Sequence, residues 1–219
     1  MSRAQQFMVP TKGGGISYLI RDLFTDTRAA GAVNGMPATP GPGTRNVADT
    51  AETNVTVGSG YMSIAGTGTW GQSACYYSES IARVANRVIY VDVYPTGNGA
   101  ASGQYVGLQD AAEHKANPLY VIYSVRFYQG GIDIYVAGAL TDADVAVYAA
   151  NTQYRLRFTL KATGCTIDIS GGAFGALGEA WTTLKDSGDD STATLYLAMN
   201  ARLTDAFRYD NVQVFDSAT

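Results

Sequence analysis

The sequence contains one histidine, His114, and two cysteines, Cys75 and Cys165, among its 219 residues. Serine or cysteine nucleophiles usually need a histidine base, and disulfide frameworks or zinc sites need several closely spaced cysteines. His114 lies in a polar stretch, Glu113-His114-Lys115, which is typical of a solvated side chain. The two cysteines are far apart within apolar stretches, so we expect two unreactive thiols in the core.

Charge is also scarce in this sequence. Charged residues make up 16% of the chain, against about 25% in ordinary globular proteins. The 15 Lys and Arg residues against 19 Asp and Glu give a net charge of −4, and no basic run is present to contact nucleic acid or an anionic membrane. No apolar run reaches the ~18 residues that span a bilayer.

The first six residues of the chain lack the apolar core of a secretory signal peptide. We therefore expect a protein that is synthesised and retained in a cytoplasm. Residues 1–15 are polar or irregular and end in Gly13-Gly14-Gly15, which predicts an N-terminal arm with a hinge before a single domain at residues 16–219.

Glycine and tyrosine are abundant, with 25 and 15 copies, and alternation of apolar and polar residues fills the chain after about residue 54. In residues 154–161 the alternation is complete, so one side of this strand is buried and the other is wet. Gly-containing turns at residues 129–131 and 162–164 join strand pairs as hairpins. Further strands are predicted at residues 89–94, 119–128, 132–136, 166–170, 194–200 and 209–215.

The remaining stretches contain little regular structure. Residues 31–46 hold three prolines and four glycines and predict a long surface loop. Residues 171–193 predict one further strand and a turn, and residues 109–115 are a helical candidate too short to form a layer. Many strands without crossover helices indicate an all-β, antiparallel two-sheet sandwich.

Four segments of the chain stand in a characteristic order: Asp22-Leu23-Phe24-Thr25-Asp26 before a Gly/Pro loop, Tyr105-Val106-Gly107-Leu108-Gln109-Asp110, residues 154–160, and Phe207-Arg208-Tyr209-Asp210-Asn211-Val212-Gln213-Val214. In this order they resemble the concanavalin A-like lectin/glucanase jelly rolls, in particular the laminin-G-like modules, over about residues 17–216. The resemblance implies a jelly-roll sandwich with its N- and C-terminal strands adjacent in one sheet. That superfamily includes lectins, glycan-binding modules, glycoside hydrolases and lyases, and accessory domains of phage virion proteins.

The retaining glucanases of that superfamily carry Glu-x-Asp-x-x-Glu, and no glutamate of this chain has aspartate two residues later. The legume-lectin metal loop is likewise missing. Asp92 and Asp133 are candidates for an unusual carboxyl pair on neighbouring strands, as a glycosidase requires. Two hydrated aspartates balanced by Arg126, Arg155 or Arg157 are the favoured alternative, so we expect no catalytic residue and no enzyme activity.

Aromatic and polar side chains alternate out of the apolar faces of several predicted strands. Tyrosine rings and neighbouring hydrogen-bonding groups suit stacking against a sugar. The same residue types also cover sandwich faces or subunit interfaces, so glycan contact and interface remain open alternatives. The candidate residues are Tyr90, Asp92, Tyr94, Tyr120, Arg126, Tyr128, Tyr135 and Trp70, with Tyr196 and Asn200 beside them.

A structural Ca²⁺ beside the terminal strands is implied by the resemblance, and no other cofactor is expected. Asp210 has the parity of Val212 and Val214, which predicts an inward carboxylate, and Asp22 or Asp26 could complete an oxygen cage. The alternative is a set of carboxylates capped by backbone N–H groups or by an arginine.

For function, the resemblance favours a non-enzymatic accessory protein of a bacteriophage virion, either a capsid decoration or a tail protein, with a domain for glycan contact. A free carbohydrate-binding module and a glycan hydrolase or lyase are the alternatives. We expect a homo-oligomer, with a trimer as the expected state, that contacts a major capsid or tail protein. Phe7, Met8 and Val9 in the N-terminal arm are the expected anchor.

Overall fold

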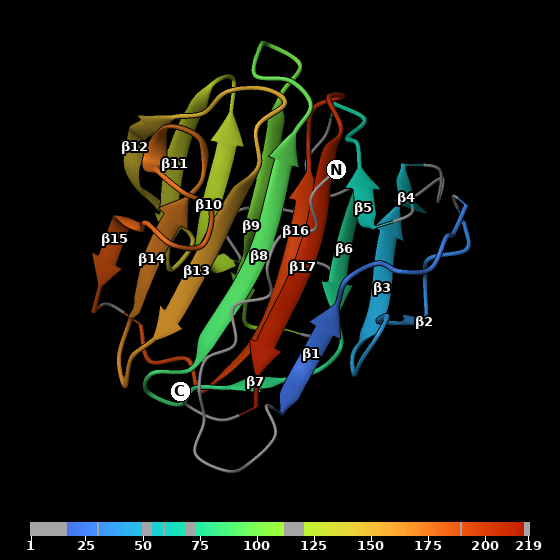
Figure 1. Ribbon diagram of the computed structural model, residues 1–219. Helices are drawn as coiled ribbons and strands as arrows, with labels where there is room; N and C mark the ends of the chain where they lie inside the picture. Colours follow the sequence, from blue (N-terminus) through green and yellow to red (C-terminus); the bar gives the residue numbers. More distant parts are fainter. Residues whose placement is uncertain are drawn as a thin grey trace.

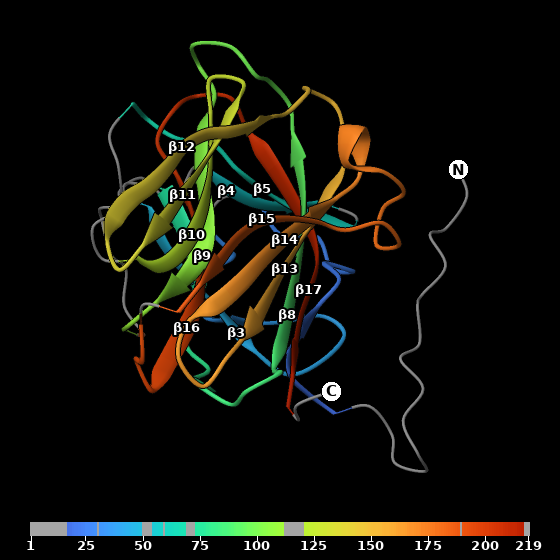
Figure 2. The ribbon, with the colours of Figure 1, turned by 90° about the vertical axis from the view of Figure 1, so that its left-hand side faces the viewer.

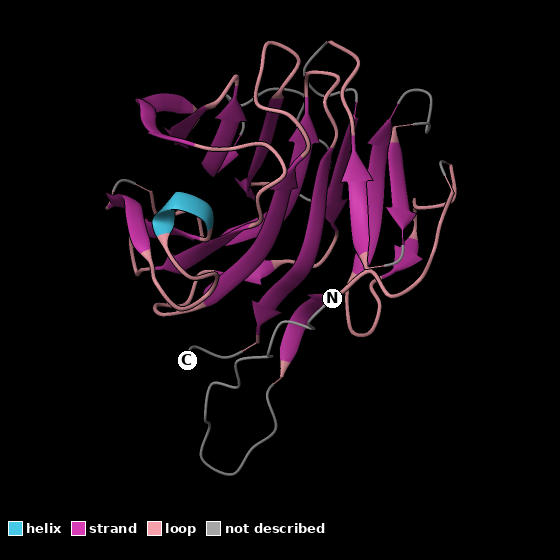
Figure 3. Cartoon of the chain, turned by 45° about the horizontal axis from the view of Figure 1, so that its top comes forward, coloured by secondary structure: helices cyan, strands magenta, loops and turns pink. Residues whose placement is uncertain are grey.

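A computed structural model describes residues 17–29, 31–49, 54–58, 60–68, 73–111, 121–188 and 190–216. These residues form two antiparallel sheets packed face to face, with one short 3-10 helix, η2 (Gly172–Phe174) (Figures 1 and 3). The predicted all-β two-sheet sandwich is confirmed. Within the described part of the chain, no helix is long and apolar enough to cross a membrane. Several predicted features lie outside the described residues: Phe7, Met8 and Val9 with the rest of the arm, Trp70, His114, Tyr120 and most of the helical candidate.

The first sheet, sheet A, contains eight strands and both ends of the described chain. β1 pairs with β17 from Tyr18 opposite Phe215 to Asp22 opposite Val212, which confirms that the terminal strands are neighbours. In order across the sheet, the strands are β15 (Thr182–Ser187), β14 (Cys165–Ser170), β13 (Tyr154–Leu160), β8 (Val88–Pro95), β17 (Phe207–Phe215), β5 (Tyr61–Ile64) and β4 (Val55–Gly58), with β1 (Tyr18–Asp22) also beside β17.

The second sheet, sheet B, contains nine strands and lies behind sheet A in Figure 1, as the side view in Figure 2 also shows. The hairpin turns predicted at residues 129–131 and 162–164 are confirmed, between β10 and β11 and between β13 and β14. The strands are β12 (Ala139–Val147), β11 (Gly131–Val136), β10 (Val121–Tyr128), β9 (Gly103–Gln109), β16 (Thr194–Ala201), β6 (Ser73–Tyr77), β3 (Thr44–Asp49) and β2 (Met36–Pro37), with β7 (Ile81–Ala82) also paired to β16.

The core lies between the sheets and follows the predicted alternation. On β13 the burial of residues alternates along the whole strand. Phe127 lies at its centre, with its ring centroid 5.2 Å from Tyr148 and 5.8 Å from Phe207. Cys75 and Cys165 are both free and fully buried, as expected. Burial of Phe127, Tyr148 and Phe207 stabilises the fold, because each ring removes a large apolar area from water.

The prediction of a surface loop at residues 31–46 is wrong in part. β2 and the start of β3 fall within it, and Arg45 is fully buried, although a charged residue near prolines and glycines reads as exposed. The strand β12 has no counterpart in the sequence-based assignment, because its residues are mostly exposed and small or acidic.

The prediction that Asp210 points inward is also wrong. β17 carries a bulge between Asp210 and Gln213, and Asn211 has a left-handed backbone with φ of 51°. A bulge adds one residue to a strand and reverses the faces that follow. Phe207 and Tyr209 therefore point inward before the bulge and Val212 after it, whereas Asp210 belongs to the outer face.

Candidate functional site

The predicted tyrosine-rich set is divided between the outer faces of the two sheets. Tyr90, Asp92 and Tyr94 lie on β8 of sheet A, whereas Arg126, Tyr128 and Tyr135 lie on β10 and β11 of sheet B. The proposed pair of Asp92 and Asp133 is wrong for the same reason, since the two strands belong to different sheets. Alternation along a strand shows which side is wet but does not show which sheet contains the strand.

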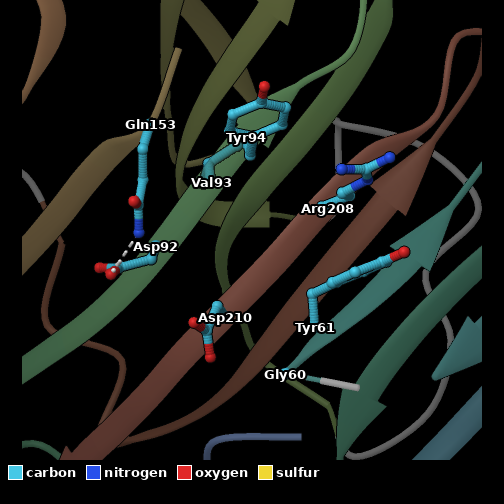
Figure 4. Close-up of a pocket in the computed structure, with 8 residues that line it drawn as sticks. All are labelled: Gly60, Tyr61, Asp92, Val93, Tyr94, Gln153, Arg208 and Asp210. Atoms are coloured by element: carbon cyan, nitrogen blue, oxygen red, sulfur yellow. Dashed lines mark hydrogen bonds between the residues drawn. The ribbon is translucent and has the colours of Figure 1, made fainter. Parts of the chain in front are cut away.

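A pocket of about 170 Å³ opens on the outer face of sheet A. Figure 4 shows Arg208 lying between Tyr94 and Tyr61, with Asp92 and Gln153 together on the opposite side. Aromatic rings, charged groups and an amide therefore converge on one concave surface. The lining residues are Gly60, Tyr61, Asp92, Val93, Tyr94, Gln153, Arg208 and Asp210.

Strand register brings these side chains together from distant parts of the chain. On β8 and β17, Asp92 lies directly opposite Asp210, and Tyr94 lies opposite Arg208. On the far side of β17, β5 contributes Tyr61 beside its hairpin turn. Residues opposite each other in antiparallel strands have Cβ atoms about 4.5–5.5 Å apart, so the pocket is a compact grid of side chains.

Asp92 is the buried carboxylate of the pocket, with 3% of its surface exposed. Arg155 binds both of its oxygens, with Nε 2.5 Å from Oδ1 and Nη2 2.7 Å from Oδ2. The amide of Gln153 donates a further hydrogen bond to Oδ2 at 3.1 Å. Burial raises the pKa of Asp92, and the bidentate contact with Arg155 opposes that rise.

Asp210 is the titratable carboxyl of the pocket. Burial, with a smaller contribution from the negative charge of Asp92, raises its pKa to about 6, although the hydrogen bond from the Asn211 backbone amide and the charge of Arg155 oppose the rise. That amide nitrogen lies 2.6 Å from Asp210 Oδ1. Asp210 therefore changes charge near neutral pH, whereas an ordinary aspartate has a pKa close to 3.9.

Arg208 is exposed and stacks on two tyrosine rings. Its guanidinium carbon lies 4.7 Å from the ring centroid of Tyr61 and 5.6 Å from that of Tyr94. Contacts of this kind orient a guanidinium while leaving its N–H groups available to a ligand.

The outer face of sheet B carries a second, much smaller hollow of about 20 Å³. Its floor is formed by Ala74, Gly107 and Ala198, and a Cβ at Gly107 would lie 2.2 Å from the Tyr123 carbonyl oxygen. At its other side, the predicted residues Arg126, Tyr128 and Tyr135 do form one cluster. The guanidinium carbon of Arg126 lies 4.5 Å from the ring centroid of Tyr128 and 5.2 Å from that of Tyr135, and its Nη2 is 2.5 Å from the carboxylate of Asp133.

The described fold is similar to that of known lectin and glycoside hydrolase structures. No protein-family model and no curated protein sequence matches the chain. The carbohydrate recognition domain of Emp46p matches with a TM-score of 0.56 at 9% identity, over 80% of this chain and 89% of that one. A glycoside hydrolase family protein from Mycobacterium thermorestibile matches with a TM-score of 0.55 at 13% identity, over 90% and 100%. Lectin II from Ulex europaeus matches with a TM-score of 0.50 at 11% identity, over 74% and 89%.

The chain has the concanavalin A-like jelly-roll fold. The resemblance stated from the sequence is thereby confirmed at the level of the fold. Sequence identities this low show a shared fold but no shared residue roles. The function of this concanavalin A-like domain therefore depends on its own side chains.

The predicted calcium ligands of this concanavalin A-like domain are not brought into one cage. The carboxylate of Asp22 is fully buried and accepts hydrogen bonds from Arg45 Nε at 2.6 Å and from the Tyr77 hydroxyl at 2.9 Å. Asp26 accepts from Arg45 Nη2 at 2.9 Å, and Asp210 lies on the outer face. In the described ranges, no group of three or more His, Cys, Asp and Glu side chains is placed to hold a metal ion. The capping arginine that the sequence left as an alternative is Arg45.

Sequence reasoning missed Tyr61, Gln153 and Arg208, and it placed Asp210 on the wrong side of β17. The signal for Arg208 was present, because Phe207 and Tyr209 flank it in the alternation of a half-buried strand. Tyr61 and Gln153 come from a short strand and from a loop, where alternation gives no information.

Proposed function

We propose that this protein binds carbohydrate and that its sugar lies in the pocket on the outer face of sheet A. The observation that carries the proposal is the set of two tyrosine rings, two carboxyls, an amide and a guanidinium around one cavity of about 170 Å³. Sugars are recognised by stacking of their apolar faces on aromatic rings and by hydrogen bonds to their hydroxyls. The likeness to the Emp46p carbohydrate recognition domain and to a plant lectin supports this proposal.

The hollow on sheet B supports the same function less well. Its volume of about 20 Å³ holds little more than one water molecule, whereas the pocket on sheet A is several times larger. The cluster of Arg126 with Tyr128 and Tyr135 is closed by the ion pair to Asp133. A sugar at that face would have to compete with contacts that the protein already makes.

We further propose that the bound sugar is not hydrolysed. A glycosidase needs a carboxylate free to attack the sugar or to activate water, beside a carboxyl that donates a proton. Asp210 has the raised pKa of a proton donor, and it lies opposite Asp92. Asp92, however, has both oxygens bound by Arg155 and a further contact with Gln153.

Hydrolysis is the second candidate function because of this carboxyl pair and the likeness to a glycoside hydrolase family protein. Incubation of the protein with a broad polysaccharide panel, followed by detection of new reducing ends, separates the two functions. We expect no turnover. Turnover that is lost in Asp210→Asn or Asp92→Asn would contradict the binding-only proposal.

The binding test uses paired tyrosine substitutions on the two outer faces. In a glycan array, Tyr94→Ala should lose at least about tenfold in affinity, since stacking and burial of one ring are worth about 1.5 kcal/mol or more. Tyr128→Ala removes a matched, partly exposed tyrosine from sheet B and should bind as the unmodified protein does. Equal binding by the unmodified protein and Tyr94→Ala would contradict the assignment of the sugar site to this pocket.

From the family resemblance we also propose that the domain serves in a bacteriophage particle as a capsid decoration or tail protein. This proposal includes self-association and contact with other virion proteins. Mass spectrometry of purified particles tests it directly, and absence of the protein from the particles would leave the free carbohydrate-binding module as the better account.

A further inference from the structure

Arg208 differs from three other arginines that point outward from strands of the sandwich. Arg126, Arg155 and Arg157 each form an ion pair with an aspartate, at distances of 2.5–2.9 Å. Among the described residues, Arg208 has no carboxylate within ion-pair distance, and its contacts are the two tyrosine rings. An exposed arginine is fully hydrated in the empty protein, so a ligand anion can replace water without breaking an internal ion pair.

The position of Arg208 makes it part of the pocket rather than of the open surface. It lines the cavity together with Tyr61 and Tyr94, and Figure 4 shows its guanidinium between those two rings. A sugar ring stacked on either tyrosine therefore has a substituent within reach of the guanidinium. The flat fork of N–H groups matches two oxygens of a carboxylate or of a sulfate ester.

The charges around the pocket leave Arg208 as its uncompensated cation. On β8, Asp92 is paired with Arg155 of β13, and the side chain of Gln153 carries no charge. On β1, Asp22 lies farther away and is neutralised by Arg45. Asp210 also faces the cavity, and its ionisation lowers the net charge of the pocket around Arg208.

We propose that the ligand of this pocket is an anionic sugar, whose carboxylate or sulfate group binds the Arg208 guanidinium while its ring stacks on Tyr61 or Tyr94. This inference rests on the proposed function, because it names the class of sugar that the same pocket binds. Arg208 is then the residue that sets specificity, and the tyrosines and Gln153 supply contacts that neutral and acidic sugars share.

A pH dependence follows from the position of Asp210 beside Arg208 on the same strand face. Burial and the charge of Asp92 raise the pKa of Asp210 to about 6, so the carboxyl is neutral at pH 5 and negative at pH 7.5. Sugar carboxylates and sulfates are ionised at both pH values. Affinity for an anionic sugar should therefore fall as pH rises, because a like charge forms beside the ligand.

The experiment is a calorimetric titration with three oligosaccharide probes of equal length: a neutral one, a hexuronate and a sulfate ester. At pH 5, the unmodified protein should bind one or both anionic probes at least about tenfold more tightly than the neutral probe. The affinity for them should fall by about tenfold at pH 7.5. The stronger of the two anionic probes identifies the kind of anion.

Three variants separate specificity from folding. Arg208→Gln should bind the anionic probes no better than the neutral one, because it should lose more affinity for the anionic probes than for the neutral probe. Asp210→Asn should retain the pH 5 affinity at pH 7.5. Arg157→Gln removes an outward arginine of the same sheet that is ion-paired to Asp168 and lies outside the pocket, and it should keep the full preference for anionic probes.

The outcomes for the two proposals differ. Equal affinity for neutral and anionic probes, or equal loss of both in Arg208→Gln, contradicts the anionic ligand and leaves carbohydrate binding intact. No binding of any probe by the folded protein, as checked by circular dichroism, contradicts both proposals.

Discussion

Asp210 lies across from Asp92 on the neighbouring strand, and its carboxyl loses a proton less readily in the folded protein than in the unfolded chain. A pKa raised by folding means that ionisation costs more in the folded state. The cost is absent well below pH 4, where both states are protonated, and is complete well above pH 6, where both are ionised. Stability contributed at this position is therefore lost as pH rises from 4 to 6.

Asp210→Asn removes this cost, so it should raise the free energy of unfolding at pH 7.5 by about 1–2 kcal/mol, after allowance for partial exposure. At pH 3 the variant and the unmodified protein should be equally stable, because Asp210 is protonated in both states. Urea unfolding at both pH values measures the difference. Asp186→Asn, at an exposed aspartate that binds Lys161, is the control and should show no such gain at pH 7.5. A pH-independent effect of Asp210→Asn would contradict the assignment.

At the scale of one element, β17 combines two functions in a single strand. Its inward residues complete the core, and its bulge keeps Val212 inward although Asp210 faces the pocket. Asn211 makes the bulge with a positive φ of 51°, a conformation that asparagine and glycine adopt more readily than branched residues. Its amide also donates to Asp210. The bulge therefore decides which side chains face the ligand.

Asn211→Val places a β-branched residue in a left-handed conformation and should lower the free energy of unfolding by about 1–3 kcal/mol. Asn211→Gly relieves the backbone and should be clearly more stable than the valine variant, although it loses the side-chain contacts of asparagine. Thermal unfolding of the two variants side by side is the measurement. If valine and glycine were equally tolerated, the bulge would not be held by this backbone conformation.

The buried face of most strands could be predicted from the alternation of apolar and polar residues, and the exceptions have physical causes. In β8 and β13, every second residue is apolar, so the sequence predicts the core face without knowledge of the partner strand. The bulge at Asn211 breaks that rule, because one extra residue changes the parity of Asp210 without altering the composition. The pocket was not predictable, since it depends on register between β5, β8 and β17, which are far apart in the sequence.

At the scale of the whole molecule, a buried group of charges connects the two sheets. Asp22 ends β1 of sheet A, whereas Arg45 lies on β3 and Tyr77 on β6 of sheet B. Arg45 is fully buried and bound to Asp22 and Asp26, and it also stacks on Phe24 with its guanidinium carbon 5.0 Å from the ring centroid. An arginine among prolines and glycines is typical of a loop, so this cross-sheet contact could not be predicted from the sequence.

Arg45→Met leaves Asp22 buried without a cation and should lower the free energy of unfolding by about 3–5 kcal/mol. Lys161→Met breaks the exposed pair with Asp186 and should change it by less than about 1 kcal/mol. The Arg45 hydrogen bonds also hold the pKa of Asp26 well below its usual value. The stability that Asp26 contributes is present above pH 4 and lost below it. The free energy of unfolding of Arg45→Met should therefore depend less on pH below pH 4 than that of the unmodified protein. Equal losses in both variants would contradict the cross-sheet role.

The central claim is that the outer face of sheet A binds sugar. Backbone amide chemical shifts, recorded during titration with the tightest oligosaccharide from the probe set, test this claim most directly. We predict that the shifted resonances belong to β5, β8 and β17 around Tyr61, Tyr94 and Arg208, with sheet B unaffected. Shifts confined to β9, β10 and β16 around Gly107 would place the sugar on the opposite face and contradict the account.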